Sequence, residues 1–229
     1  MTLAFITPEE WQAVWLSIRV AIACVVIELP IAIALGYVLA RKQFIGRGLI
    51  NALIHLPLVL PPVVVGYVLL ITLGTGFNEL FGIRIAFTWW AAVIAAAVMS
   101  LPLMVRPIRL AIESIDTNTE KAAATLGASP WRVLRTVTLP LAAPGILIGI
   151  VLAFARSLGE FGATIIFAGN ISGETRTLPS AIYTAIQSPG GDAAAIRLVV
   201  LSIAISIASM IAAEILARRA RNLTGASDD

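Results

Sequence analysis

The residues best suited to chemistry are two opposite charges inside an apolar segment. Arg156 and Glu160 occur in VLAFARSLGEFGATIIF, four residues apart, so both would lie on one face of a helix. A charge at the centre of a bilayer costs about 2.5–3.5 kcal/mol on insertion scales, so the pair should face a partner helix or a water-filled path. Gly159 and Gly162 flank Glu160 and allow a close helix crossing. The pattern predicts either an anion path or gate, or an ion pair that locks helices together.

A second candidate site is a run of prolines in another apolar segment, HLPLVLPPVVVGYVLL, which contains Pro57, Pro61 and Pro62. Proline removes a backbone donor and clashes with the preceding turn. Membranes tolerate such breaks where neighbouring helices or an aqueous cavity satisfy the freed carbonyls. Pro61 and Pro62 are therefore candidates for lining a translocation path, and a simple packing kink is the alternative. Glu28, in the first apolar segment, is a further acid without an evident local partner.

Other reactive side chains are sparse. Cys24 is the single cysteine and His55 the single histidine, and both lie in apolar segments. We interpret Cys24 as a packing residue and His55 as a hydrogen-bonded histidine at a helix interface. Neither lysine, Lys42 or Lys121, follows a glycine, so the GxxxxGK[ST] phosphate loop is absent, as are GxSxG and HExxH motifs. We expect no catalytic residue, no metal site and no cofactor, and any ATP must be hydrolysed by another subunit.

A polar, basic island, EKAAATLGASPWRVLRTVTLP, fills residues 120–140 between two apolar segments. Asp116 and Thr117 are candidate N-caps of a first short helix, and Gly127 suits the left-handed residue that ends it. Pro130 can occupy the first turn of a second helix. We expect a helix–turn–helix that lies across the membrane surface and presents a ridge of alanines to a partner's cleft.

Composition indicates the elements that must position these residues. The 229 residues are 59% hydrophobic and 13% charged, with a mean hydropathy of +0.95, so charges are too few to cover a water-soluble globule. A membrane span needs about 20 apolar residues, and five windows meet this, at 12–40, 49–73, 89–111, 141–168 and 195–217. The first window also has room for a short interfacial helix, WQAVWLSIRVA, which would be a sixth element. We expect an all-α integral membrane protein.

Charge placement predicts the orientation of the chain. Most of the 16 basic residues follow the first, third and fifth windows. The positive-inside rule then puts the N-terminus outside, the C-terminus in the cytoplasm, residues 115–138 in the cytoplasm and residues 170–192 outside. The outer loop should hold a short helix from Pro179 to Gln187. Membrane topology accounts for the basic balance, so nucleic acid is not an expected partner.

The polar island resembles the EAA motif of ABC importer permeases, a pattern of Glu-Ala-Ala, a later Gly and a final Ile-x-Leu-Pro. In this chain the Glu position of the motif falls on Lys121, and the acid stands one residue earlier. The resemblance implies that the island couples the chain to an ATPase through Glu120, Ala122, Ala123, Gly127, Leu139 and Pro140.

Three longer stretches resemble the permease subunit of molybdate ABC importers: HLPLVLPPVVVGYVLL, AAAVMSLPLMVRPIRLAIE and FARSLGEFGATIIFAGNISGETRTLPSAIYTAIQSPGG. The resemblance implies a type I ABC importer permease fold with about five transmembrane helices, or six with the interfacial helix. Its transmembrane domain would fill residues 12–217, with the EAA coupling loop at 115–138 between spans three and four and a cytoplasmic tail at 218–229.

The same resemblance implies the partners. A homodimer in the bacterial inner membrane would bind two cytoplasmic ATP-binding subunits, and a periplasmic or tethered binding protein would deliver molybdate or tungstate. Two alternatives stay open here. One is a sulfate or thiosulfate permease of the same architecture. The other is an anion secondary transporter using Arg156, which an inverted repeat with paired broken helices would favour, whereas the sequence shows one proline-broken span.

Overall fold

The computed structural model describes residues 6–224, and the regular elements in this range are all helical. Five of its helices are long and apolar enough to cross a membrane, as the sequence predicts. In chain order the elements, with π-type segments marked η, are α1 (Pro8–Arg41), α2 (Arg47–Val59), α3 (Pro62–Leu69), η1 (Leu70–Gly76), α4 (Phe77–Phe81), α5 (Trp89–Glu113), α6 (Thr117–Thr125), α7 (Pro130–Val133), η2 (Leu134–Thr138), α8 (Leu139–Leu158), α9 (Gly162–Phe167), α10 (Leu178–Gln187) and α11 (Asp192–Thr224).

The first predicted window forms one long helix, α1. Its start is fixed by a capping box, in which the Glu10 N–H donates to the Thr7 hydroxyl and the Thr7 N–H donates to the Glu10 carboxylate at 2.8 Å. The Thr-x-x-Glu signal for this cap is present in the sequence. The expected separate interfacial helix is wrong, because WQAVWLSIRVA contains no helix breaker and lies inside α1.

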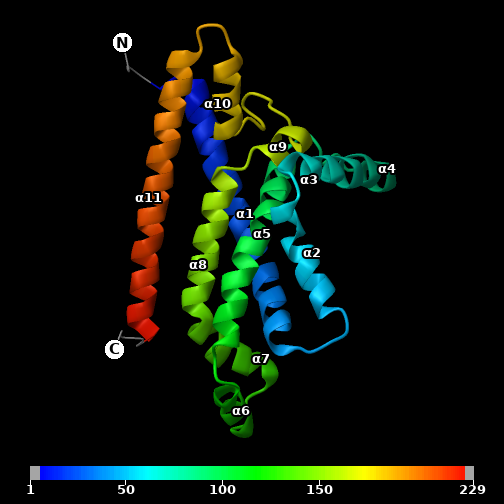
Figure 1. Ribbon diagram of the computed structural model, residues 1–229, viewed down its shortest axis with the longest axis vertical. Coiled ribbons are helices and arrows are strands. Elements are labelled where there is room, and N and C mark those ends of the chain that lie inside the picture. Colours follow the sequence, from blue (N-terminus) through cyan, green and yellow to red (C-terminus); the bar gives the residue numbers. More distant parts are fainter. Residues whose placement is uncertain (1–5, 225–229) are drawn as a thin grey trace.

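The second predicted span is interrupted where two prolines stand together. α2 ends at Val59, Leu60 and Pro61 are extended, and α3 starts at Pro62. A residue before proline is pushed out of the helical region, and both Leu60 and Pro61 precede one. α3 and α4 then lie across the long axis of the other helices (Figure 1). The predicted span 49–73 therefore crosses a break.

The fourth predicted span, residues 141–168, is interrupted as well. α8 ends at Leu158 and α9 begins at Gly162, so the three residues between them leave the helix. One proline-broken span was predicted, so this second break corrects the predicted span 141–168. Two apolar segments within residues 6–224 are thus broken.

The polar island differs from the prediction in its second half. The helix that begins at Pro130 runs to Leu158 as a single span, so it is not a separate helix on the membrane surface. The junction is the π-type segment η2, where the Leu139 N–H donates to the carbonyl of Leu134, five residues back. Pro140 has no N–H with which to continue the usual ladder, and the wider turn accommodates this.

The centre of the molecule is the contact of α5 with α1 on one side and α8 on the other. Glycines allow the close approach of α8 to α5. A Cβ at Gly145 would lie 2.3 Å from the Cβ of Ala111, and one at Gly149 would lie 2.9 Å from the carbonyl oxygen of Met104. Small residues of this kind let backbones approach within a membrane.

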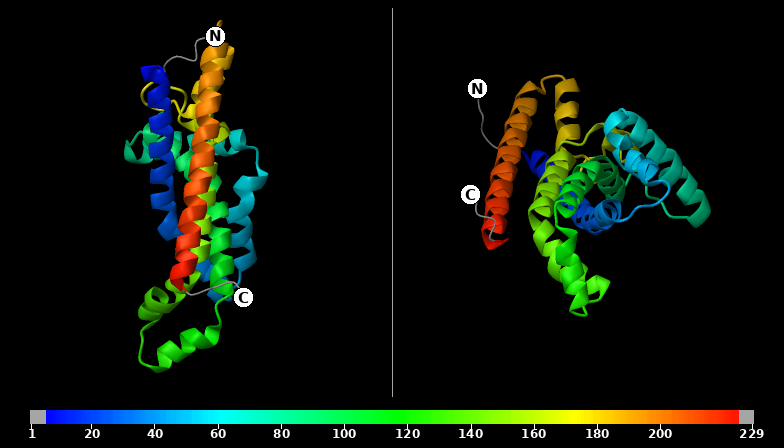
Figure 2. Two further views of the ribbon diagram at one scale, coloured as in Figure 1. Left: turned by 90° about the vertical axis from the view of Figure 1, so that its left-hand side faces the viewer. Right: turned by 60° about the horizontal axis from the view of Figure 1, so that its bottom comes forward.

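The two ends of the molecule carry different elements. α6 and α7 lie at the end where α11 finishes, and the start of α1 lies at the opposite end, beside α10 (Figures 1 and 2). The outer-loop helix predicted for residues 179–187 is confirmed as α10. The membrane sidedness of the two ends stays a prediction.

Candidate functional site

The two breaks in the apolar segments meet in space. α3, which follows the break at Pro61, packs against α9, which follows the break after Leu158 (Figure 1). The contact is tight on both sides. A Cβ at Gly162 would lie 2.6 Å from the Cβ of Pro62, and one at Gly66 would lie 2.6 Å from the carbonyl oxygen of Ala163. The structure thus places Pro62 against Gly162, two residues that the sequence analysis proposed as parts of separate candidate sites.

Arg156 and Glu160 form an ion pair at the second break. They do not share a helical face as predicted, since α8 ends between them at Leu158. The Glu160 side chain is 1% exposed and that of Arg156 is 26% exposed. The other oxygen of Glu160 accepts the N–H of Ala163 at 2.9 Å and so caps α9. Glu160 therefore holds the break in place, and Arg156 is the member of the pair that reaches open space.

A buried polar cluster, made of Glu28, Cys24, Ser100 and Ser157, lies between α1, α5 and α8. The Ser100 hydroxyl lies 2.9 Å from both carboxylate oxygens of Glu28, and the Cys24 thiol donates to one of them at 3.4 Å. Cys24 and Ser157 are 3.1 Å apart. Glu28 thus has partners that the sequence did not reveal, because Ser100 is far along the chain. Cys24 is a member of a hydrogen-bonded group as well as a packing residue.

The local capping signals predicted for the polar island are confirmed. The Asp116 carboxylate accepts the N–H of Asn118 and caps α6. Gly127 adopts φ +86°, and the N–H groups of Gly127 and Ala128 donate to the carbonyls of Ala124 and Ala123, which is a Schellman ending. Pro130 is the first residue of α7.

The island presents an apolar surface. Leu126 is 89% exposed and Trp131 is 64% exposed, and Ala122 beside them is exposed too. Ala123 is half-buried. Leu139 and Pro140 are the first two residues of α8 and are not part of the surface formed by Leu126 and Trp131. An apolar surface at the end of a polar loop indicates a protein partner.

Glu120 is tied to the membrane helices. Its carboxylate pairs with the Arg41 guanidinium at 3.0 Å and accepts the Thr138 hydroxyl at 2.6 Å. Arg41 also donates to the carbonyl of Ile115 at 3.1 Å. The acid displaced by one residue from the motif therefore anchors α6 to the end of α1 and to η2, whereas Lys121 in the motif position is exposed.

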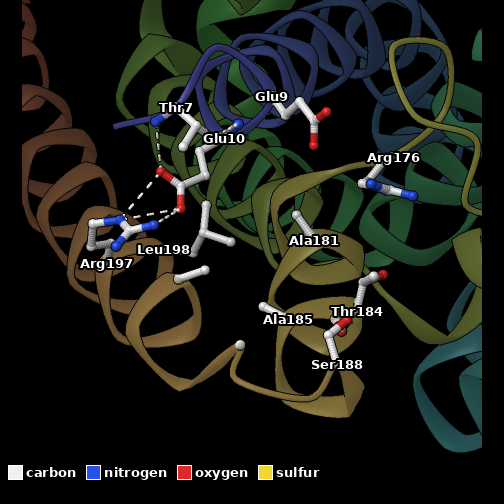
Figure 3. A pocket seen from close by; sticks show the side chains of 12 residues that line it. Thr7, Glu9, Glu10, Arg176, Ala181, Thr184, Ala185, Ser188, Arg197 and Leu198 are labelled. Carbon is white, nitrogen blue, oxygen red and sulfur yellow. Dashed lines mark hydrogen bonds and ion pairs between the residues drawn. The ribbon is translucent and has the colours of Figure 1, made fainter. Parts of the chain in front are cut away.

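A pocket of about 300 Å³ lies at the opposite end, between the start of α1, α10 and α11, and we call it the outer pocket after the predicted orientation. Figure 3 shows Glu10 and Arg197 pointing toward one another, with Thr184 of α10 and Ser188, the residue after α10, on another wall. The Arg197 guanidinium donates to Glu10 at 2.7 Å. The pair ties α11 to the start of α1.

The comparison with protein families decides what kind of chain this is. Residues 32–222 match the model of the binding-protein-dependent transport system inner membrane component. The chain belongs to this permease family. The match covers both broken segments, the polar island, the C-terminal part of α1 from residue 32 and nearly all of α11.

Individual relatives agree with the family. The permease is 56% identical over 226 residues to the molybdenum transport system permease protein ModB of Escherichia coli, covering 96% of this chain and 99% of the relative. It is 50% identical to ModB of Haemophilus influenzae, covering 94% and 97% of the two chains.

The fold has solved counterparts. A chain of the MetNI methionine ABC transporter, in inward-facing conformations, matches with a TM-score of 0.73 at 18% identity, covering 94% of this chain and 99% of that chain. The predicted all-helical ABC importer permease fold is confirmed.

Proposed function

We propose that this permease is the membrane subunit of an ATP-driven importer of molybdate or tungstate. The observation that carries the proposal is the 56% identity, over nearly the full length of both chains, to a permease named for molybdenum transport. Two relatives named for molybdenum transport are 50% or more identical to this permease, which favours molybdate over sulfate or thiosulfate as its cargo. Family membership counts against the secondary transporter, in spite of the second helix break.

The proposed assembly is a homodimer with two ATP-binding subunits and a delivery protein. The exposed apolar tip of the island, Leu126 and Trp131, supports docking of an ATP-binding subunit at that end, which would be cytoplasmic. The outer pocket and α10 would face the delivery protein at the other end. The chain itself would do no catalysis.

The contacts of the island suggest how it transmits motion. A push on α6 reaches α1 through the Glu120–Arg41 pair and reaches α8 through η2, which continues into that helix. α8 ends at the Arg156–Glu160 pair, which holds α9 against α3. Movement of α8 would thus be delivered to the place where the two broken segments meet, the candidate gate.

Reconstitution tests the function. The permease, its ATP-binding subunit and its delivery protein in liposomes should take up molybdate only when ATP is supplied on the side of the ATP-binding subunit. Sulfate should not compete at equal concentration. Uptake of sulfate in preference to molybdate would contradict the proposed cargo, and uptake without the ATP-binding subunit would contradict the proposed class.

The Arg41–Glu120 pair gives a prediction about coupling. Arg41→Gln should lower molybdate uptake per ATP hydrolysed by several-fold, because an ion pair that links two elements is lost while α6 keeps its own caps. Loss of one partner of a charged hydrogen bond costs about 1.5–3 kcal/mol. Arg135→Gln removes an exposed cation of the same island and is the matched control. An unchanged ratio of uptake to hydrolysis in Arg41→Gln would show that the pair transmits nothing.

Membrane sidedness gives another prediction. Ser129→Cys lies at the start of α7 and Ser188→Cys just after α10, and both positions are exposed. In a Cys24→Ser background, which keeps a hydroxyl in the buried cluster, an impermeant maleimide should label Ser188→Cys from outside and Ser129→Cys only after the membrane is opened. Labelling of both from one side would refute the five-span topology.

A further inference from the structure

A second pocket, the inner pocket, lies between α2 and α5 and has a volume of about 380 Å³. At about 30 Å³ per water molecule, this is room for a dozen waters or for a hydrated oxyanion. The pocket is separate from the candidate gate and from the coupling island. Its lining is Asn51, His55, Arg106, Arg109, Leu110 and Glu113.

The charges around the inner pocket do not balance. Glu113 is the one carboxylate of the lining, and it is engaged by Arg109 at 2.8 Å and by Arg47 at 3.4 Å. Arg106 is exposed and has no hydrogen-bond or ion-pair partner in the part of the chain that the structure describes. The lining therefore holds two guanidinium groups and one carboxylate, and Arg47, outside the lining, also pairs with that carboxylate, which leaves an excess of positive charge.

Asn51 is the neutral group of the pocket that has free donors. The Asn51 side-chain oxygen accepts from Arg109 at 2.9 Å, so its amide N–H groups are left for another acceptor. The His55 Nδ1 lies 2.8 Å from the carbonyl oxygen of Asn51, which can only accept, so this nitrogen carries the proton. The donor of a neutral His55 is thus already used, and the pocket's donors to an anion are the Asn51 amide and the guanidinium groups. The pocket thus offers donors and positive charge, which is the chemistry that recognises an oxyanion.

The depth of Arg106 indicates that it needs an aqueous or anionic neighbour. It lies seven residues before the last residue of α5, about 10 Å at 1.5 Å per residue. That end of α5 is the end that carries α6 and α7 (Figure 1). A free guanidinium at this depth that faced acyl chains would be costly. A water-filled pocket that an anion can enter removes that cost.

We propose that the inner pocket is a binding site for a tetrahedral oxyanion on the cytoplasmic half of the permease, used by the cargo as it leaves. The inference rests on the proposed function and deepens it. Arg106 would bind the anion in a bidentate manner, because two N–H groups of a guanidinium match the spacing of two oxyanion oxygens. Glu113 limits the net field, so that the anion binds weakly enough to be released.

The test is protection of a reporter cysteine, measured without transport. Leu110→Cys, at an exposed lining position, is made in the Cys24→Ser background of the intact complex without its delivery protein. Labelling by a neutral maleimide should slow as sodium molybdate or tungstate is added, and sodium chloride at equal ionic strength should not slow it. Arg106→Gln should raise the half-protecting concentration about tenfold or more, because a charge-assisted hydrogen bond is lost.

Two further variants sharpen the test. Arg106→Lys should lie between Arg106→Gln and the parent, because it keeps the charge and loses the fork. Lys42→Gln, which removes an exposed cation at the same end but outside the pocket, should match the parent. If Arg106→Gln does not assemble, protection of the Leu110→Cys reporter with Arg106 intact, and its weakening in Arg106→Lys, still test the site.

A lipid phosphate offers the same chemistry, so the reporter is also measured in nanodiscs of phosphatidylcholine with and without phosphatidylglycerol. Protection by molybdate in phosphatidylcholine alone supports the cargo site. Protection by phosphatidylglycerol with no further effect of molybdate overturns it, as does an absence of protection in every condition. Normal ATP-driven uptake of molybdate without protection of the Leu110→Cys thiol would count against the inner pocket alone. Protection of this thiol without molybdate uptake would count against the proposed function alone.

Discussion

The Gly127→Val permease should fail to import molybdate and should copurify poorly with its ATP-binding subunit. Gly127 has φ +86° at the turn between α6 and α7, and a left-handed backbone costs an L-residue about 1–2 kcal/mol, with β-branched residues among the worst. A Cβ there would meet nothing within 4 Å, so the cost comes from the backbone alone. The turn should open and displace Leu126 and Trp131, the proposed docking surface.

Two matched variants isolate the backbone effect. Gly48→Val adds the same side chain at a glycine that also has open space around it but an ordinary φ, and it should import normally. Gly127→Asn introduces the L-residue that tolerates the left-handed region best, and it should retain part of the activity. Copurification and delivery-protein-stimulated ATPase activity are the measurements. If both are normal in Gly127→Val, the turn is not needed for coupling.

The second large effect is expected at the ion pair. Arg156→Gln should lower the melting temperature of the detergent-solubilised complex strongly, because it leaves the buried carboxylate of Glu160 without its cation. Breaking one partner of a buried pair typically costs about 3–5 kcal/mol. Arg156→Gln combined with Glu160→Gln should regain most of the stability and part of the uptake. The side-chain oxygen of glutamine can still accept the N–H of Ala163 and cap α9.

The same variants distinguish a structural ion pair from a residue that contacts the anion on its path. An Arg156→Gln permease that melts like the parent and assembles, but does not import, would assign Arg156 to the anion path. The partly exposed guanidinium makes this the sharpest alternative. Glu10 with Arg197 supplies a control, because Arg197→Gln breaks a comparable pair at the outer end of the molecule. Arg197→Gln should lose stability and should leave the gate unaffected.

The parts of the structure that the sequence predicted are those with local causes. Asp116 caps α6 and Gly127 ends it because each acts on backbone groups within a few residues. The break at Pro61 follows from the missing N–H and the crowding that proline imposes on its predecessor. Hydropathy gave five spans because bilayer thickness sets the length of an apolar helix.

The parts that were missed depend on contacts between distant residues. The break after Leu158 contains no proline, and it is held by Glu160 and by the approach of Gly162 to Pro62. The partners of Glu28 come from α5, and the anchor of Glu120 comes from the end of α1. A pattern within one short stretch of sequence does not indicate which distant side chain will contact it in the folded protein.

The glycine contacts between α8 and α5 set the mechanics of the permease. At Gly145 and Gly149 there is no space for even a methyl group, so sliding one helix along the other would drive a larger side chain into a backbone. Sliding is therefore blocked, and α5 and α8 should swing together as one stiff lever. The bending that alternating access requires must then occur at hinges. The two helix breaks, at Leu60–Pro61 and at Gly159–Phe161, are where the backbone can bend.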